Sequence, residues 1–303
     1  MRTAEGLEPA EERKKNIRTI HRGDEDYPER LQILPDRPDK IYVLGELPGN
    51  RPSVAIVGAR MCSHYGRIQA HAFGRALAEA GIQVISGMAL GIDCYAQEGA
   101  LDGGGKTFAV LGCGADICYP KSNFSTYTEI QKHGGILSEE EPGTLPLSYN
   151  FPKRNRIISA LSDIVLVVEA REKSGSLITV DFALEQGKTV FALPGRVGDT
   201  LSDGCNHLIA QGAGIACSPQ AILQEFGMGD FISETGNRQK EQKIKGLSPE
   251  AAKICRAIYC EQRTLDELLK LFSFGTQKTA AALLELQIAD LVEEDAGHIY
   301  VKK

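Results

Sequence analysis

The sequence lacks several features that would assign it to a compartment or a cofactor class. It has no apolar run long enough to cross a bilayer, and residues 2–20 are charged and lack the apolar core of a secretory signal. We therefore expect a cytoplasmic protein with no membrane partner. The eight cysteines include no C-x-x-C pair. This spacing is not typical of a zinc site or a disulfide framework, so we interpret the cysteines as reduced, small apolar residues.

Basic residues are fewer than acidic ones, 34 against 40. The formal net charge is −6 and the isoelectric point is near 5.6. This balance argues against a protein that covers nucleic acid with its whole surface. It allows a local basic groove, because charges interact over a Debye length of about 8 Å at physiological salt. A nucleic-acid site must therefore be a specific basic patch.

A chain of 303 residues is long enough for two or three folding units. Residues 1–50 are polar and predict a lead-in segment with a strand at 40–44. Residues 51–226 carry a regular α/β pattern. Residues 227–246 are polar and charged and predict a linker. Residues 247–303 predict three helices and a hairpin, with a capping box at Thr264 and Glu267, which indicates a winged-helix domain.

Within 51–226, short apolar runs alternate with helical patterns. The expected strands are 54–57, 83–85, 107–111, 135–137, 164–168 and 189–193, and the expected helices are 66–80, 93–101, 127–133, 177–186 and 205–211. Apolar strands alternating with helices predict a doubly wound, mostly parallel sheet that is covered on both faces. Ligands of such sheets bind beyond the carboxyl ends of the strands.

Two loops at those strand ends could hold an anion. In 58–66 we expect Arg60 to bind phosphate and Ser63 to cap the following helix; a salt bridge to a neighbouring loop is the alternative for Arg60. In 86–93, Ser86 and Gly87 precede a helix N-terminus that favours negative charge. The alternative for this second loop is a simple tight turn with Asp93 as the helix N-cap, and the two interpretations are compatible.

Two further loops lie after later strands. Phe151 is followed by Lys153, Arg154, Asn155 and Arg156, a cationic run that we expect just before a helix. A ring for base stacking beside cations for phosphate is typical of single-strand binders, although such runs are usually solvated charge clusters. The loop 173–179 contains Ser174, Gly175 and Ser176 and predicts another anion-binding helix N-terminus.

Motifs for catalysis and cofactor binding are missing. The sequence has no G-x-G-x-x-G, Walker A, H-E-x-x-H or G-x-S-x-G motif, and its histidines are dispersed. We expect no metal, no cofactor and no catalytic residue.

At these loops the sequence resembles the DNA-processing protein A (DprA, or Smf) family. The resemblance runs from about residue 27 to 226 and includes VAIVGAR, ISGMALGID, AVLGCGADICYP, FPKRNRIIS, EAREKSGSLITVDFALEQGK and ALPGRVGDTLSDGCNHLIAQGA. It implies a Rossmann-like, non-enzymatic protein that binds single-stranded DNA. Such a protein protects incoming strands in natural transformation, helps to load the RecA recombinase and acts as a homodimer.

The resemblance also carries over DNA-contacting positions. These are Arg60 and Lys153, supported by Ser63, Ser86, Gly87, Phe151, Arg154, Asn155, Arg156, Ser174, Gly175 and Ser176. The third helix of the C-terminal domain contains one cation, Lys278, so we do not expect it to read duplex DNA.

Two alternatives remain open from the sequence. One is a nucleotide N-glycosidase of the lysine-decarboxylase-like (LOG) type, whose motif P-G-G-x-G-T-x-x-E ends in a catalytic glutamate. Here the position three after Thr179 is Phe182, so that carboxylate is missing. The other is a transcription factor that acts through the winged-helix domain.

Overall fold

The computed structural model describes residues 16–228, 246–258, 263–289, 291–295 and 298–301. The chain divides into two compact units, one up to Phe231 and the other from Ile232. The predicted linker, 227–246, lies almost entirely outside the described residues. Each unit is considered by itself.

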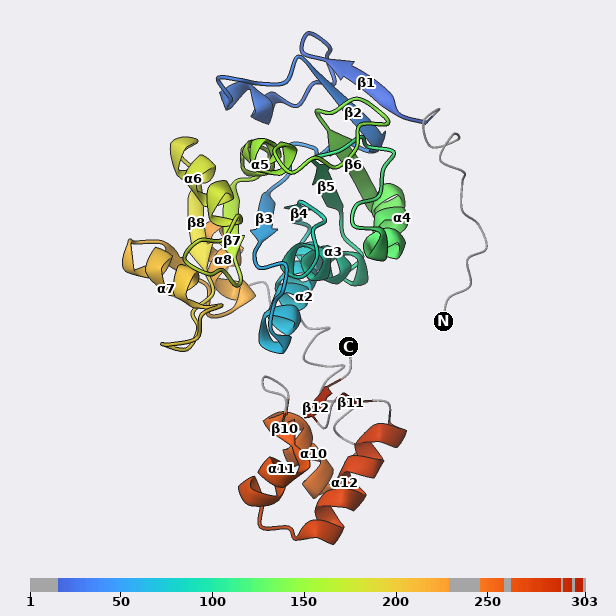
Figure 1. The fold of residues 1–303 in the computed structure, drawn as a ribbon, viewed down its shortest axis with the longest axis vertical. Helices are drawn as coiled ribbons and strands as arrows, with labels where there is room; N and C mark the ends of the chain where they lie inside the picture. The colour runs from blue at the N-terminus through green and yellow to red at the C-terminus, as the bar shows by residue number, and fades with distance from the viewer. Residues whose placement is uncertain (1–15, 229–245, 259–262, 290, 296–297, 302–303) are drawn as a thin grey trace. The chain divides into compact units, whose positions relative to one another are not determined.

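The first unit is built on a nine-stranded sheet (Figure 1). In sheet order its strands are β1 (Arg18–His21), β2 (Lys40–Gly45), β6 (Gly134–Ser138), β5 (Thr107–Leu111), β4 (Gln83–Ser86), β3 (Ser53–Val57), β7 (Ile164–Val167), β8 (Thr189–Ala192) and β9 (Gly214–Ile215). The strands from β6 to β9 are parallel, whereas β2 is antiparallel to both β1 and β6. The prediction of a mostly parallel sheet is confirmed.

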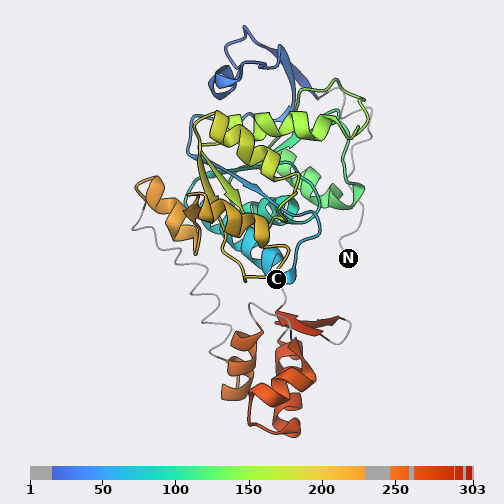
Figure 2. The same cartoon turned by 60° about the vertical axis from the view of Figure 1, so that its left-hand side comes forward.

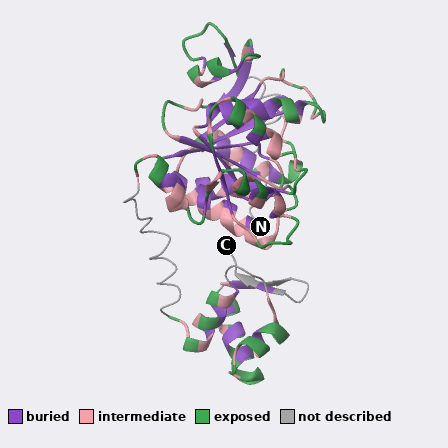
Figure 3. Ribbon diagram, turned by 90° about the vertical axis from the view of Figure 1, so that its left-hand side faces the viewer, coloured by how far each residue is buried: buried purple, intermediate pink, exposed green. Residues whose placement is uncertain are grey.

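Strands β3 to β7 form short runs that are buried along their whole length, and Figure 3 shows the sheet as the buried centre of the unit. Side chains alternate between faces along a strand, so Ala55 and Val57 join one core while Val54 and Ile56 join the other. Two apolar faces require helices on both sides. This is why the sequence shows nearly continuous apolar strands.

Helices cover the two faces in separate groups (Figure 2). One face packs against α5 (Asn150–Leu161), α6 (Leu177–Glu185) and α7 (Asp203–Ala210). The other packs against α2 (His64–Glu79), α3 (Ile92–Asp102), α4 (Phe124–His133) and α8 (Pro219–Glu225). The short helices η1 (Glu29–Ile33) and η2 (Lys121–Asn123) lie in connections.

The order of the strands in the sheet changes direction at β3, which creates a topological switch point. Strand β3 pairs with β4 on one side and with β7 on the other. The connections that leave β3 and β7 therefore diverge at their carboxyl ends, and an open parallel sheet leaves a crevice there. The candidate site lies at this point.

The second unit contains α10 (Pro249–Ala257), α11 (Leu265–Leu271) and α12 (Thr276–Ile288), with a small antiparallel sheet. Its strands, in sheet order, are β10 (Arg263–Thr264), β12 (His298–Val301) and β11 (Val292–Asp295). Thr264 and Glu267 form the predicted capping box. Three helices with a β-hairpin are the parts that a winged-helix domain uses, and that assignment stays a prediction.

Two local predictions are wrong. The cationic run after Phe151 is not a loop before a helix, because α5 begins at Asn150 and contains the whole run. Asp93 is not the N-cap of α3; that position is held by Gly91, and the Asp93 carboxylate turns back to accept the N–H of Gly87. The predicted cap at Ser63 is present, since its hydroxyl accepts the N–H of Gly66 at 3.0 Å.

Helices α2 and α3 approach so closely that their contact accepts only glycine. A Cβ at Gly74 would lie 2.0 Å from the carbonyl oxygen of Ala96, and one at Gly99 would lie 2.1 Å from that of His71. These neighbours are backbone atoms, so they cannot move without separating the helices. The pair fixes the distance between α2 and α3, and α3 borders the candidate site.

We expect Gly74→Ala to lower the free energy of unfolding by about 2 kcal/mol, because overpacking a close contact forces the backbones apart. Urea denaturation followed by far-ultraviolet circular dichroism measures the change. Gly23→Ala is the matched control, since a Cβ at Gly23 has no neighbour within 4 Å. Equal midpoints for the two variants would show that the helices separate at little cost.

Candidate functional site

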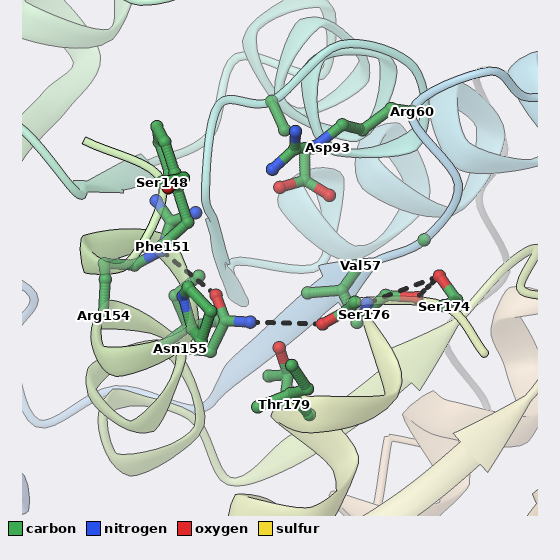
Figure 4. Close-up of a pocket in the computed structure, with 16 residues that line it drawn as sticks. Val57, Arg60, Asp93, Ser148, Phe151, Arg154, Asn155, Ser174, Ser176 and Thr179 are labelled. Carbon is green, nitrogen blue, oxygen red and sulfur yellow. Dashed lines mark hydrogen bonds between the residues drawn. The ribbon is translucent and has the colours of Figure 1, made fainter. Parts of the chain in front are cut away.

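A pocket of about 420 Å³ opens at the carboxyl ends of β3 and β7 (Figure 4). In the figure Arg60 and Asp93 lie on one side of it, and Asn155, Ser176 and Thr179 lie on the other. The lining comes from the loop after β3, the start of α3, the start of α5 and the start of α6. The full set is Val57, Gly58, Arg60, Ala89, Asp93, Ser148, Phe151, Pro152, Arg154, Asn155, Ile158, Ser174, Gly175, Ser176, Ile178 and Thr179.

Arg60 is the accessible cation of this pocket. It is exposed, and its guanidinium lies 5.5 Å from the ring centroid of Phe151. In the part of the chain that the structure describes, Arg60 forms no ion pair, so the predicted alternative of a salt bridge is not seen. A guanidinium over a ring face remains able to bind phosphate through its N–H groups.

Arg154 also lines the pocket, but its side chain is buried and is held by groups inside the protein. Its side chain donates to the carbonyl oxygens of Gly87, at 3.1 Å, and Val110. Burial lowers the pKa of Arg154 to about 10, and the nearby carboxylate of Asp93 opposes the shift. At neutral pH the guanidinium is therefore still charged. It ties the ends of β4 and β5 to α5.

Asp93 is the partner of Arg154 at the start of α3. Burial raises its pKa, while the charge of Arg154 and the N–H of Gly87 lower it. A Cβ at Gly87 would lie 2.7 Å from Arg154 Nη2 and 2.8 Å from Asp93 Oδ2. Glycine is thus required at this position by the buried pair, in addition to any need for a tight turn.

The opposite wall is formed by the start of α6. The Ser174 and Ser176 hydroxyls lie 2.7 Å apart, and Asn155 Nδ2 donates to the Gly175 carbonyl oxygen at 3.3 Å. Ser176 is the N-cap residue of α6. The first N–H groups of a helix have no partner within the helix, and the helix dipole favours an anion there. This wall offers small polar groups and no negative charge.

The loop that carries Arg60 is anchored by one buried carboxylate. Glu169, at the end of β7, accepts the Ser63 N–H at 2.8 Å through Oε2 and the Ser63 hydroxyl through Oε1. Glu169 is 2% exposed, and a Cβ at Gly66 would collide with its carboxylate. Burial raises the pKa of Glu169, against the effect of the two Ser63 donors. Ser63 thus caps α2 and holds the loop to β7.

The predicted site residues divide into two sets. Those that line the pocket are Arg60, Phe151, Arg154, Asn155, Ser174, Gly175 and Ser176. Those that do not line it are Ser63, Ser86, Gly87, Lys153 and Arg156, and their contact with DNA stays a prediction. The Ser86 hydroxyl donates to the carbonyl oxygen of Ile56 at 2.6 Å, and the Gly87 N–H is taken by Asp93.

Lys153 and Arg156 lie on another face of α5. Both pair with Glu139, at 3.2 Å and 2.8 Å, and Arg156 also pairs with Asp36 at 2.8 Å. Arg156 is 3% exposed, whereas the Lys153 side chain is 50% exposed. A helix turns by about 100° per residue, so residues three apart share a face and the intervening Arg154 points elsewhere. Residues 153–156 are continuous in the sequence, but Lys153 and Arg156 lie on one face of α5 and Arg154 lies on another.

Sequence reasoning missed several lining residues. Ser148 lies in the connection before α5, which has no motif. Val57 was placed only in the expected strand 54–57, and Ile158 was given no role of its own. Ile178 and Thr179 belong to the predicted loop 173–179, and the helical pattern that starts at Leu177 places both in the first turn of α6. The helical pattern from Leu177 could therefore have identified Ile178 and Thr179 as candidate site residues.

The described residues hold no group of His, Cys, Asp and Glu side chains arranged to bind a metal ion. The seven cysteines in the described part are all free, and Cys260 lies outside it. No helix among the described residues has the length and the apolar character to pass through a membrane.

Comparison with known proteins assigns the chain to a family. Residues 18–227 match DNA recombination-mediator protein A, and the chain belongs to that family, which is also called DprA or Smf. The chain is 33% identical to Protein Smf of Synechocystis, over 97% of this chain and 82% of that protein. It is 45% identical to DNA processing protein DprA of Streptococcus pneumoniae, over 67% of this chain and 72% of that protein. The predicted resemblance is confirmed.

Solved structures of DNA processing protein A have the same fold as this chain. The X-ray structure of DprA from Streptococcus pneumoniae superposes with a TM-score of 0.67 at 41% identity, covering 71% of this chain and 76% of that one. DNA processing protein A from Helicobacter pylori, studied for its single-stranded-DNA binding mode, superposes with a TM-score of 0.63 at 34% identity, covering 71% of this chain and 97% of that one. The Rossmann-like fold is confirmed.

The buried carboxylate Glu169 makes stability depend on pH. Its raised pKa means that the native state holds the proton more tightly than the unfolded state does. Stability from this group is therefore present below its ordinary pKa of 4.5 and is lost as the pH rises through the native pKa. We expect Glu169→Gln to show a shallower fall in the free energy of unfolding across this window, by at most about 1.4 kcal/mol per pH unit.

Urea denaturation of both proteins at a series of pH values measures this difference. Glu172→Gln, at an exposed position three residues further along the same connection, is the control and should follow the parent chain. Parallel curves for Glu169→Gln and the parent chain would show that Glu169 does not hold a proton in the native state.

Proposed function

We propose that this chain binds single-stranded DNA in the pocket at the ends of β3 and β7 and carries out no chemistry on it. The observation that carries the proposal is the exposed Arg60 guanidinium, with no ion pair in the described part of the chain, lying over the half-buried ring of Phe151 at the pocket rim. A guanidinium suits phosphate and a ring suits a base. The single-stranded-DNA binding mode described for the Helicobacter pylori relative supports the same ligand.

The remaining predicted residues take two roles in this proposal. Phe151, Asn155 and the loop Ser174–Ser176 contact the strand with Arg60, and Lys153 contacts a phosphate at the edge of α5 when it leaves Glu139. A second group supports the pocket from inside the protein and makes no direct contact. It consists of Ser63, Ser86, Gly87, Arg154 and Arg156.

The pocket chemistry favours binding over catalysis. Among its described lining residues Asp93 is the one carboxylate, and it is occupied by Arg154 and the Gly87 N–H. At the position where a LOG-type glycosidase carries its glutamate, this chain has Phe182 on α6. A general acid or base must be within reach of the proton that it transfers and must be free to exchange it. These residues provide no second carboxylate for that purpose.

Membership of the family suggests the partners of this chain. We infer a cytoplasmic homodimer that protects incoming single strands in natural transformation and helps to load RecA. The match of residues 18–227 to DNA recombination-mediator protein A supports a role in recombination.

Arg60→Ala should weaken binding of an oligothymidylate about tenfold and reduce the salt dependence of binding, with the slope of log K against log salt falling by about 0.7 for the lost phosphate contact. Fluorescence anisotropy with a labelled oligonucleotide at several salt concentrations measures both. Arg22→Ala removes an exposed arginine that does not line the pocket, so it should change neither quantity. An Arg60→Ala protein that binds like the parent chain would remove the pocket from the proposal.

Incubation with nucleoside monophosphates should release no free base above the background without protein, because Asp93, the one carboxylate among the described lining residues, is already paired with Arg154. Reversed-phase chromatography of the reaction detects the base. If base appears and is lost in Asp93→Asn, the protein is an enzyme of the glycosidase type and the proposal of binding alone fails.

A further inference from the structure

A second aromatic ring lies next to the pocket but outside it. The ring of Tyr119, in the connection that follows β5, has its centroid 5.6 Å from that of Phe151, with the planes tilted by 33°. Tyr119 is 42% exposed. Among the described residues its hydroxyl has no hydrogen-bond partner. The ring packs against Phe151 and still has a large exposed fraction, so it is available to a ligand.

Phe151 is fixed from several directions, so it provides a rigid support for that second ring. Arg60 and Arg154 lie 5.5 and 5.9 Å from its centroid, and a Cβ at Gly112 would lie 3.1 Å from its Cδ1 atom. The distance between the two rings is within the range of favourable aromatic pairs. Phe151 and Tyr119 therefore form a short row of rings that leads from the pocket rim to the surface.

A cation follows Tyr119 in the chain. Lys121 begins η2 and is exposed, and it forms no ion pair in the part of the chain that the structure describes. This distinguishes it from Lys153 and Arg156, whose charges are compensated by Glu139. A ring beside an uncompensated cation is the combination that binds one base and one phosphate of a single strand.

We propose that Tyr119 and Lys121 form a second subsite for the same single strand, outside the pocket, where one base stacks on the Tyr119 ring and a phosphate meets Lys121. This inference rests on the proposed function, because the strand that reaches Tyr119 is the one held at Arg60 and Phe151. The bound strand then runs along the carboxyl edge of the sheet, from the start of α6 past β3 toward the connection after β5.

The sequence offers a direct reporter of stacking, because it contains no tryptophan. Tyr119→Trp places a single indole at the proposed subsite, and oligothymidylate should quench its fluorescence as a base stacks on it. Leu184→Trp is the matched control, since this α6 residue is 61% exposed and does not line the pocket. Its fluorescence should not change with the same oligonucleotide.

Affinity measurements separate the ring from the cation. Tyr119→Ala should weaken binding of an oligothymidylate about tenfold, and Tyr119→Phe should bind like the parent chain. For an abasic oligomer of the same length, which keeps its phosphates, Tyr119→Ala should have no effect. Lys121→Ala should weaken binding of both oligomers and lower the salt slope by about 0.7.

The outcomes are distinguishable from those that test the pocket itself. Binding that depends on Arg60 but is the same in Tyr119→Ala and the parent chain would overturn the second subsite and leave the proposed function standing. Weaker binding by Tyr119→Ala without quenching in Tyr119→Trp would mean that Tyr119 only orients Phe151, which also overturns it. No binding of oligothymidylate by the parent chain would overturn both.

Discussion

One buried guanidinium organises the site and the structure around it. Arg154 reaches from α5 to the carbonyl oxygens of Gly87 and Val110, and it faces the carboxylate of Asp93 at the start of α3. The contacts join two strand ends to two helices on opposite faces of the sheet. A buried charge is tolerated only when it is paired and hydrogen-bonded, so each of these groups must stay in place. The requirement for glycine at position 87 follows from the same pair.

The parallel sheet could be predicted from the sequence because its signal is local. Apolar runs such as Thr107–Leu111 can be buried only between two layers, and their alternation with helical patterns fixes the fold class. The two antiparallel edge pairings could not be predicted, since β1 (Arg18–His21) is polar and short and is held by its partner β2. The position of α5 was also misjudged. Pro152 stands in its first turn, where proline is tolerated, and the charges that follow it suggested a loop.

The site could be predicted only in part, because side-chain direction depends on the whole fold. Arg60 and Ser174–Ser176 lie in the connections that leave β3 and β7, so the sheet rule places them at the pocket. For the cationic run, the outcome depended on which face of α5 met the sheet. Arg154 is buried while its neighbour Lys153 stays half-exposed, and Glu139, which compensates Lys153 and Arg156, comes from a different connection. No spacing in the sequence reports that long-range pairing.

The attachment of Ser63 to Glu169 has a consequence for the entropy of binding. Because the backbone on both sides of Arg60 is held by this contact and by the hydrogen bond from Ala59 to the carbonyl oxygen of Glu169, the loop needs no ordering when a ligand arrives. The cost is then restricted to the side chain of Arg60, whose rotamer freedom is worth up to about 2 kcal/mol. A preorganised backbone of this kind leaves more of the gross interaction energy as affinity.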